Sequence, residues 1–376
     1  MTRVCIVQPV MKNYRVPFFQ LLQRQLAADG IELVVQYGRP SRHEALRGDN
    51  VALPPPLGHE SAVWPWPGSP LVWQPALRPW RGADLVVTEH ANKHLHNHLL
   101  ALLRHRAFGR FAYWGHGRDR QADPQAAGER WKRRSLHQAD WWFAYTAGAA
   151  AYLQDQGFAA GRITTVQNAV DTRALRAALA AWPPERRVAA RVARGWGRDD
   201  RVAVYCGSLY PNKRLDWLVD AGRRLHEAVP GFRLLVLGGG PQAGWMGEQA
   251  RTHAGWLRYE GPAFGDAKVE GLALADLWLN PGLVGLGILD AFVAGLPFFT
   301  TDLPLHSPEI EYLQPGVNGA VSAPDPAAFA AEVQAALADA PRLARWAAAA
   351  REAGQRHGVE TMAANFAAGV RACLGR

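Results

Sequence analysis

The chain has 376 residues, of which 48% are hydrophobic and 20% are charged, a composition that excludes a disordered or fibrous protein. This length accommodates about two domains. The formal net charge is +9, and residues 1–170 carry most of it, with 20 basic and 12 acidic side chains. The three cysteines are far apart and form no CxxC motif, so a reducing, cytoplasmic location is expected.

The first half alternates short runs rich in Val, Ile and Leu with stretches that have helical spacing. Helices are expected at Val16–Ala28 and Lys93–Arg104. Strands are expected at Val4–Gln8, Glu32–Tyr37, Asp84–Thr88, Phe111–Trp114 and Trp141–Tyr145. This alternation predicts a parallel sheet with helices on its faces, an α/β domain that is doubly wound and spans residues 1–170.

Residues 54–81 interrupt that pattern with eight prolines and with Trp64, Trp66, Trp73 and Trp80. Such a segment cannot be a regular helix. One interpretation is a long loop and an edge strand whose tryptophans pack onto the domain. The other is an aromatic platform for a sugar or lipid acceptor.

Residues 171–200 are rich in Ala, Arg and Pro and are expected to connect two domains, with Pro183-Pro184 dividing an otherwise amphipathic helix. The strand pattern then restarts, which predicts a second doubly wound domain over residues 201–355. Its expected strands are Arg201–Cys206, Arg233–Leu237, Leu257–Glu260, Leu277–Asn280 and Phe298–Thr301. Residues 356–376 are expected to form a helix that packs back on the first domain.

No secretion signal is expected, because the first ten residues lead directly into a strand pattern. Pro281–Phe299 has the length of a membrane span, but it contains Asp290 and several glycines. We expect a buried loop and helix there, and any membrane contact is therefore expected to be peripheral.

Two glycine-containing loops of the second half have the pattern of an anion site. Gly207–Arg214 follows a predicted strand and places Lys213 beyond its carboxyl end, where ligands bind in doubly wound sheets. Asn280–Pro297 contains a strand end, a glycine-rich loop and a helix start, so its backbone amides can face an anion. Asp290 is suited to a ribose diol. The alternatives are a solvated lysine and an ordinary acid in the first turn of a helix.

The order and spacing of several motifs resemble the retaining nucleotide-sugar glycosyltransferases of family 4. The matching segments are Asn168–Asp171 (N-G-V-D), Gly207–Arg214 (G-R-L-x-x-x-K-G), Gly238–Pro241 (G-x-G-P), Ala275–Pro281 (A-D-x-x-x-x-P), Gly282–Asp290 (E-x7-E), Ser307–Ile310 (P-E-I) and Gly316–Gly319 (G-x-x-G). The resemblance implies the GT-B fold, in which two Rossmann-like domains face each other across an interdomain cleft.

By this resemblance the second domain binds the donor. The implied donor-binding residues are Gly207, Ser208, Lys213, Arg214, Gly239, Gly282, Leu283, Val284, Gly285, Leu286, Asp290 and Glu309. Three of these depart from the family pattern. Ser208 replaces an arginine, Gly282 replaces the first glutamate of E-x7-E, and Asp290 replaces the second glutamate with a side chain one methylene shorter.

In the first half, His116 lies in a loop after a strand, where the family carries a histidine beside the donor sugar, and it is the expected catalytic partner of Lys213. A structural histidine is the alternative. The expected acceptor-binding residues are Arg15, Glu89, Asn92 and Arg118. His90, His94 and His98 share a helical face if that region is helical, but no carboxylate follows at zinc-site spacing. No metal site is therefore expected.

We therefore interpret the chain as a retaining, metal-independent hexosyltransferase that needs no cofactor besides its nucleoside diphosphate sugar. The expected acceptor is a lipid-linked or cell-surface glycan precursor of polysaccharide biosynthesis. The basic first half predicts peripheral contact with an anionic membrane at its inner, cytoplasmic face. Alternatives are a nucleotide-sugar epimerase or sugar phosphorylase on the same fold, or a degenerate nucleotide-sugar-binding protein. Nucleic acid is not an expected partner, because no binding motif accompanies the charge.

Overall fold

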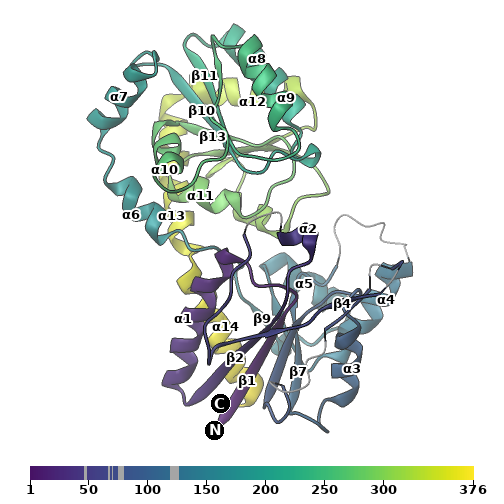
Figure 1. Cartoon of the computed structure of the whole chain (residues 1–376). Helices are drawn as coiled ribbons and strands as arrows, with labels where there is room; N and C mark the ends of the chain where they lie inside the picture. The colour runs from purple at the N-terminus through teal and green to yellow at the C-terminus, as the bar shows by residue number, and fades with distance from the viewer. Residues whose placement is uncertain (46–48, 67, 70, 75–79, 119–126) are drawn as a thin grey trace. The chain divides into compact units, whose positions relative to one another are not determined.

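The computed structural model describes residues 1–45, 49–66, 68–69, 71–74, 80–118 and 127–376. The chain forms two compact units (Figure 1). Unit 1 contains Met1–Asp171 together with Val359–Arg376, and unit 2 contains Thr172–Gly358. The chain therefore enters unit 2 at Thr172 and returns to unit 1 at Val359.

The described residues of unit 1 form a parallel seven-stranded sheet with the order β3-β2-β1-β6-β7-β8-β9. Its strands are β1 (Thr2–Gln8), β2 (Ile31–Gly38), β3 (Gly58–Ser61), β6 (Leu85–Glu89), β7 (Arg110–Gly115), β8 (Trp141–Ala144) and β9 (Ile163–Thr165). The central strands are buried along nearly their whole length, because helices cover both faces of the sheet. This confirms the predicted doubly wound sheet.

The helices of unit 1 include one from the end of the chain, α14, which lies beside α1 (Figure 1). Phe366 of α14 stacks on Phe143 at 4.0 Å between ring centroids and meets the edge of Trp114 at 5.2 Å. The last helix is therefore part of the core of unit 1. The helices are α1 (Val16–Ala28), α2 (Arg42–Ala45), α3 (Leu95–Leu103), α4 (Ala127–Ser135), α5 (Ala147–Asp155) and α14 (Val359–Leu374), with the 3-10 turns η1 (Asn13–Arg15), η2 (Leu136–Gln138) and η3 (Ala160–Arg162).

The tryptophan-rich segment contributes the edge strand β3 and a short antiparallel pair, β4 (Trp64–Pro65) with β5 (Val72–Trp73). Trp80 is buried against Phe108, with ring centroids 5.6 Å apart. Trp64 and Trp66 are instead 59% and 60% exposed. One end of the segment therefore packs onto the domain as expected, and the other displays two aromatic rings. Pro67, Pro70, Pro75 and Pro79 lie outside the described residues.

Unit 2 contains a parallel six-stranded sheet with the order β12-β11-β10-β13-β14-β15. Its strands are β10 (Arg201–Cys206), β11 (Phe232–Leu237), β12 (Leu257–Tyr259), β13 (Leu277–Leu279), β14 (Phe298–Thr301) and β15 (Gly319–Ser322). The strand order reverses between β10 and β13, the point at which doubly wound sheets bind ligands. The predicted second doubly wound domain is confirmed.

The helices of unit 2 begin with α6 and α7, which Pro183 and Pro184 separate as expected. Within this unit α6 and α7 face α10, and α13 packs along α11. The helices are α6 (Arg173–Ala180), α7 (Pro184–Ala193), α8 (Leu215–Ala228), α9 (Ala243–Thr252), α10 (Gly265–Leu274), α11 (Gly287–Val293), α12 (Pro326–Ala338) and α13 (Ala340–Arg356), with the 3-10 turns η4 (Pro211–Lys213) and η5 (Pro308–Tyr312). No helix among the described residues is long and apolar enough to cross a membrane.

Candidate active site

The loops that follow β10 and β13 meet at the carboxyl edge of the sheet in unit 2. The backbone N–H of Leu283 donates to the carbonyl oxygen of Asn212 at 2.8 Å, which joins the two loops. Beside this junction is a hollow of about 170 Å³. Its lining includes the sequence-predicted residues Gly207, Ser208, Lys213, Gly285 and Leu286. The structure therefore brings together residues from two separate motifs.

Gly282 makes this junction possible. A Cβ atom at this position would overlap the carbonyl group of Lys213. In the family pattern a glutamate occupies this position. In this chain the position lies directly against the backbone of Lys213, so it has no room for a side chain. The departure from the pattern is thus coupled to the packing of the two loops.

Lys213 is the cation of this junction. Its Nζ donates to the carbonyl oxygen of Leu283 at 2.5 Å. Burial lowers the pKa of Lys213 from 10.5 to about 8, since desolvation penalises the charged amine. At pH 7 the side chain is still mainly protonated, and its remaining donors can serve a phosphate oxygen that enters the hollow.

The neighbouring Arg214, the second cation of the Gly207–Arg214 motif, contacts an aromatic ring. Its backbone is left-handed, with φ of 51°, and its guanidinium lies over the ring of Trp217 at 4.9 Å from the centroid. Arg214 is therefore the N-cap residue of α8, with its charge against a half-buried aromatic ring.

Three glycines of the loop after β11 pack against the loop after β10. A Cβ atom at Gly238 would overlap the carbonyl oxygen of Gly207, and the carbonyl oxygen of Gly239 accepts from the backbone N–H of Leu209 at 2.8 Å. Gly240 also has a positive φ, 150°. The run Gly238–Gly240 thus lets the loop after β11 pack against the loop after β10.

Asp290 has a partner that the sequence did not reveal. Its Oδ2 accepts from Nζ of Lys268, on α10, at 2.7 Å. Burial of Lys268 opposes its charge, but the carboxylate of Asp290 outweighs this and raises the pKa of Lys268. The pair adjoins Cys206, whose pKa burial raises to about 11, so that thiol stays protonated. Neither member of the pair lines the hollow itself.

A buried histidine, His306, binds the glycine-rich loop after β13. Nδ1 of His306 accepts from the backbone N–H of Val284 at 3.0 Å, so its Nε2 carries the proton and donates to the carbonyl oxygen of Thr301 at 2.7 Å. Sequence reasoning missed His306, although it directly precedes the Ser307–Ile310 motif. Glu309 of that motif is buried within η5, 4% exposed, and is not at the hollow.

In unit 1, Arg15 is directed into the fold. It is 6% exposed, its Nη1 donates to Oδ1 of Asn168 at 2.8 Å, and its guanidinium lies 4.8 Å from the centroid of the Trp114 ring. These contacts tie the start of α1 to the segment that follows β9. The expected acceptor contact at Arg15 is therefore also a structural link within unit 1.

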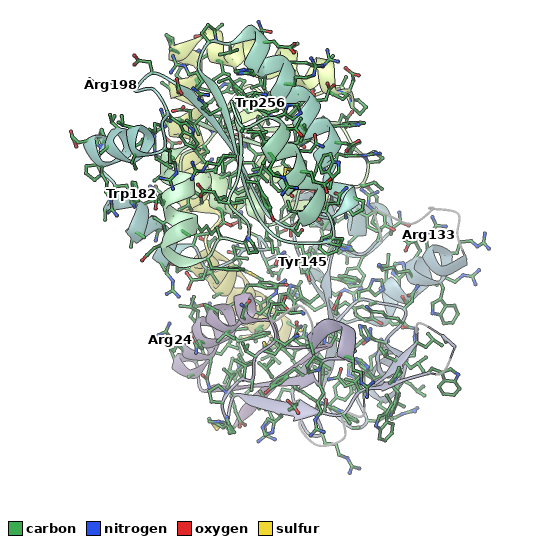
Figure 2. All side chains as sticks on the ribbon, turned by 45° about the horizontal axis from the view of Figure 1, so that its top comes forward. Arg24, Arg133, Tyr145, Trp182, Arg198 and Trp256 are labelled. Atoms are coloured by element: carbon green, nitrogen blue, oxygen red, sulfur yellow. The ribbon has the colours of Figure 1, made fainter. Side chains whose placement is uncertain are left out.

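His116 and Arg118 lie in the loop after β7. The ring of His116 meets the edge of the Tyr145 ring, with centroids 5.8 Å apart. Tyr145 directly follows β8 and is labelled in Figure 2. Arg118 is exposed and its guanidinium lies over the ring of Tyr152 at 5.0 Å. Gly117 between them has φ of 76°, which lets the loop turn sharply.

The loop after β6 approaches the same edge of this sheet. The backbone N–H of His90 donates to the carbonyl oxygen of Trp114 at 3.2 Å. Asn92 donates to the carbonyl oxygen of Gly128 at 2.6 Å, and the carbonyl oxygen of Glu89 accepts from the side chain of Asn97 at 2.8 Å. Glu89 therefore ends β6, and Asn92 and His116 belong to the adjacent loops after β6 and β7, but Asn92 is occupied by a contact with α4.

The histidines of this region are buried among aromatic rings and one another. Nε2 of His90 is 2.9 Å from Oγ of Ser135, and the rings of His94 and His96 are tilted against each other with centroids 5.3 Å apart. Burial, with a smaller effect of neighbouring positive charge, lowers the pKa of His94 to about 3 and of His96 to about 4. Across the described ranges, no group of three or more His, Cys, Asp or Glu side chains is spaced to hold a metal ion.

Two family models match the chain in its two halves. The model described as Glycosyltransferase Family 4 matches residues 18–174, and the model described as glycosyl transferases group 1 matches residues 200–339. The chain belongs to glycosyltransferase family 4. As a member of this family it is a glycosyltransferase of the GT-B type, which confirms the expected family and fold.

Solved structures of three other proteins resemble this glycosyltransferase along its whole length. Anabaena HepE, solved with UDP, has a TM-score of 0.69 and 16% identity and covers 98% of this chain and 99% of its own. The lipopolysaccharide outer core galactosyltransferase WaaB has a TM-score of 0.66, 14% identity and coverage of 98% and 99%. Sucrose-phosphate synthase from Thermosynechococcus elongatus has a TM-score of 0.68, 17% identity and coverage of 99% and 98%. No curated protein matches the chain in sequence.

Proposed function

We propose that this glycosyltransferase moves a sugar from a nucleoside diphosphate sugar to a glycan acceptor, with retention of the anomeric configuration. The observation that carries the proposal is the junction of the β10 and β13 loops around Lys213. There a protonated amine and residues of two glycine-containing loops line a hollow at the switch point of the sheet. A similar structure, Anabaena HepE, was solved with UDP and with UDP-glucose, which agrees with a nucleotide-sugar donor.

Negative charge develops on the departing nucleoside diphosphate as the bond to the sugar breaks. We assign the stabilisation of that charge to Lys213 and the loop amides, so electrostatic stabilisation is the main catalytic contribution of unit 2 in this proposal. Of the nucleophilic side chains that line the hollow, the Cys206 thiol stays protonated because burial raises its pKa to about 11, and we assign no covalent role to Ser208. We therefore favour attack from the same face as the leaving group, assisted by its phosphate, without a metal ion.

The Lys268–Asp290 pair adds a second element to the donor site. A carboxylate that is already hydrogen-bonded to an amine is held in one orientation, with lone pairs left to accept from a ribose diol. Lys268 also supplies a cation at the edge of the site, where Ser208 supplies none. We assign Asp290 to the ribose and Lys268 to the orientation of Asp290.

The acceptor that we propose is a lipid-linked or cell-surface glycan precursor, bound mainly by unit 1. Residues 1–170 carry a large excess of basic side chains, and Trp64 and Trp66 expose most of their ring surface. Basic charge and exposed tryptophan together suit an anionic membrane surface. One similar structure is a lipopolysaccharide outer core galactosyltransferase, which agrees with an acceptor of this class.

A product assay tests the transferase reaction. The full chain is incubated with each of a panel of nucleoside diphosphate sugars, with and without membrane lipid extract as the source of acceptor. Transfer predicts release of nucleoside diphosphate that depends on acceptor, together with a labelled glycolipid. Conversion of the sugar nucleotide without acceptor would indicate an epimerase, and binding without any turnover would indicate a degenerate binding protein.

Sedimentation with vesicles tests the membrane part separately. Binding to vesicles of anionic lipid at low salt should be lost at high salt and should weaken in the double variant Trp64→Ala/Trp66→Ala. Phe264→Ala is the matched control, since Phe264 is an aromatic residue of unit 2 that is 81% exposed. Equal sedimentation with neutral vesicles, or none with anionic ones, would favour an acceptor in solution.

A further inference from the structure

Unit 2 contains a second, larger groove of about 780 Å³ that shares no lining residue with the hollow at Lys213. Its walls come from α6, α7, α10, α11 and α13, and Figure 2 labels Trp182, which lies between α6 and α7. This volume is within the range of pockets that bind small molecules. The glycosyl transfer described above assigns no role to it.

Arginines dominate the polar lining of the groove. Five arginines line the groove together with a single carboxylate, that of Asp276; they are Arg176, Arg187, Arg191, Arg201 and Arg351. Asp276 already has two partners, because it accepts from Arg187 and, at 2.8 Å, from Arg191. The charge of Asp276 is thus more than compensated, and the groove retains an excess of positive charge.

Two features show that this positive charge is available to a ligand. Nε of Arg187 is buried and has no acceptor among the described residues. Arg176 and Arg351 form no ion pair with any described residue, and Arg351 lies against Gly295, where a Cβ atom would overlap its Nε. A buried donor without an acceptor costs free energy that a bound anion would recover.

The remaining walls are apolar and come from several elements. They include Leu179 and Trp182 next to α6 and α7, and Leu272, Leu296 and Leu343 from the opposite side. Such a surface contributes to binding when an apolar ligand body covers it. An inorganic anion alone would leave this surface exposed to water, and a neutral apolar ligand would leave the arginines without a partner.

We propose that this groove binds an amphipathic anion, a molecule with one anionic group on an apolar body. The anionic group lies at Arg351 and at Nε of Arg187, and the apolar body covers the leucines and Trp182. Guanidinium groups suit phosphate and carboxylate equally in geometry, so the anionic group belongs to either class.

Calorimetric titration of the full chain with dodecyl phosphate, kept below its micelle concentration, tests this proposal. We expect saturable binding that is at least about tenfold tighter than that of dodecanol or of inorganic phosphate, since neither engages both parts of the groove. Dodecanoate as a further probe distinguishes a carboxylate ligand from a phosphate ligand. Equal affinity for dodecanol, or no saturable binding of either anionic amphiphile, would overturn the proposal.

Two variants locate the binding. Arg351→Gln should weaken dodecyl phosphate binding about tenfold, whereas Arg345→Gln, an exposed arginine of the same helix outside the groove, should not. Ala344→Trp places a large ring in the groove from an exposed position of α13 and should block binding, while melting temperature and UDP binding stay as in the parent chain. Unchanged dodecyl phosphate binding in both Arg351→Gln and Ala344→Trp would show that the amphiphile binds elsewhere.

Discussion

The strand order reverses between β1 and β6 in unit 1 and between β10 and β13 in unit 2, but the polar residues in the loops at these two points make different contacts. In unit 2 the loops after β10 and β13 contact each other through backbone, and they leave Lys213 beside an open hollow. In unit 1 the corresponding loops direct Arg15 into the core and engage Asn92 with α4. The difference agrees with our proposal of an anion site in unit 2, whereas several polar groups of unit 1 hold that unit together.

The largest effect is expected from a substitution that breaks the backbone contact between the β10 and β13 loops of unit 2. Gly282→Ala should abolish measurable nucleoside diphosphate binding, because its Cβ would overlap the Lys213 carbonyl group and separate the two loops. Gly282→Glu, which introduces the residue of the family pattern, should be equally harmful. Overpacking of this kind lowers the free energy of unfolding by about 1–3 kcal/mol.

Gly244→Ala is the matched control for this prediction, since a Cβ at Gly244, in α9 and outside the lining of the hollow, would have no neighbour within 4 Å. Calorimetric titration with nucleoside diphosphate compares the three variants. Recovery of binding in Gly282→Glu would show that the loop opens to admit a side chain, contrary to the packing described here.

The next effect concerns the carboxylate of unit 2. Asp290→Asn should weaken nucleotide binding by about tenfold, whereas Asp290→Glu should retain most of it, since a ribose diol and Lys268 both need a carboxylate. A double-mutant cycle with Lys268→Gln measures how far the two side chains depend on each other. Independent, additive effects, or parent-like binding in Asp290→Asn, would leave Asp290 as an ordinary helix acid.

A change of pH sharpens the assignment of Lys213. Its pKa of about 8 means that the charged fraction falls as pH rises through 8, so nucleoside diphosphate binding should weaken by up to about tenfold per pH unit above that value. Below pH 8 the affinity should change little on account of this group. The measurement is a calorimetric titration at several values between pH 7 and 9.5.

Lys213→Arg provides the control, because a guanidinium stays protonated throughout this range. Its binding should be independent of pH between 7 and 9.5. The same fall of affinity in both proteins would assign the titration to another group.

The smallest effect on nucleotide binding is expected in unit 1. His116→Ala should lower sugar transfer by about 10²-fold or more while nucleoside diphosphate affinity remains within about twofold, because we assign His116 to the sugar and the acceptor. Steady-state kinetics and titration of the same preparation separate the two effects. A parallel loss of nucleotide binding and turnover would contradict the separation of roles between the two units.

The sequence predicted features that depend on backbone pattern better than features that depend on side-chain direction. Both parallel sheets and the two-helix segment around Pro183-Pro184 follow from hydrophobic runs and proline, and most predicted strands agree with the structure within one or two residues. The strands β9 and β15 were missed, because edge strands of three or four residues give little periodic signal.

For the candidate site, the glycine-rich loops and Lys213 were predicted from their order along the chain. Lys268 and His306 were not, because α10 and the turn before η5 reach the site only through tertiary packing. The inward direction of Arg15 was equally invisible, since its partner Asn168 is far away in the sequence. A local motif identifies a loop, but the side chains that orient it come from elsewhere in the fold.

The central claim is that unit 2 binds the diphosphate of the donor at Lys213. Calorimetric titration of UDP, GDP, ADP and CDP into the parent chain, Lys213→Ala and Lys93→Ala tests it most directly, since Lys93 is an exposed lysine of unit 1. We predict that at least one nucleoside diphosphate binds, that Lys213→Ala weakens this binding by about 1.5–3 kcal/mol without lowering the melting temperature, and that Lys93→Ala has no effect. Parent-like binding in Lys213→Ala, or no binding of any of the four nucleotides to the parent chain, would contradict the claim.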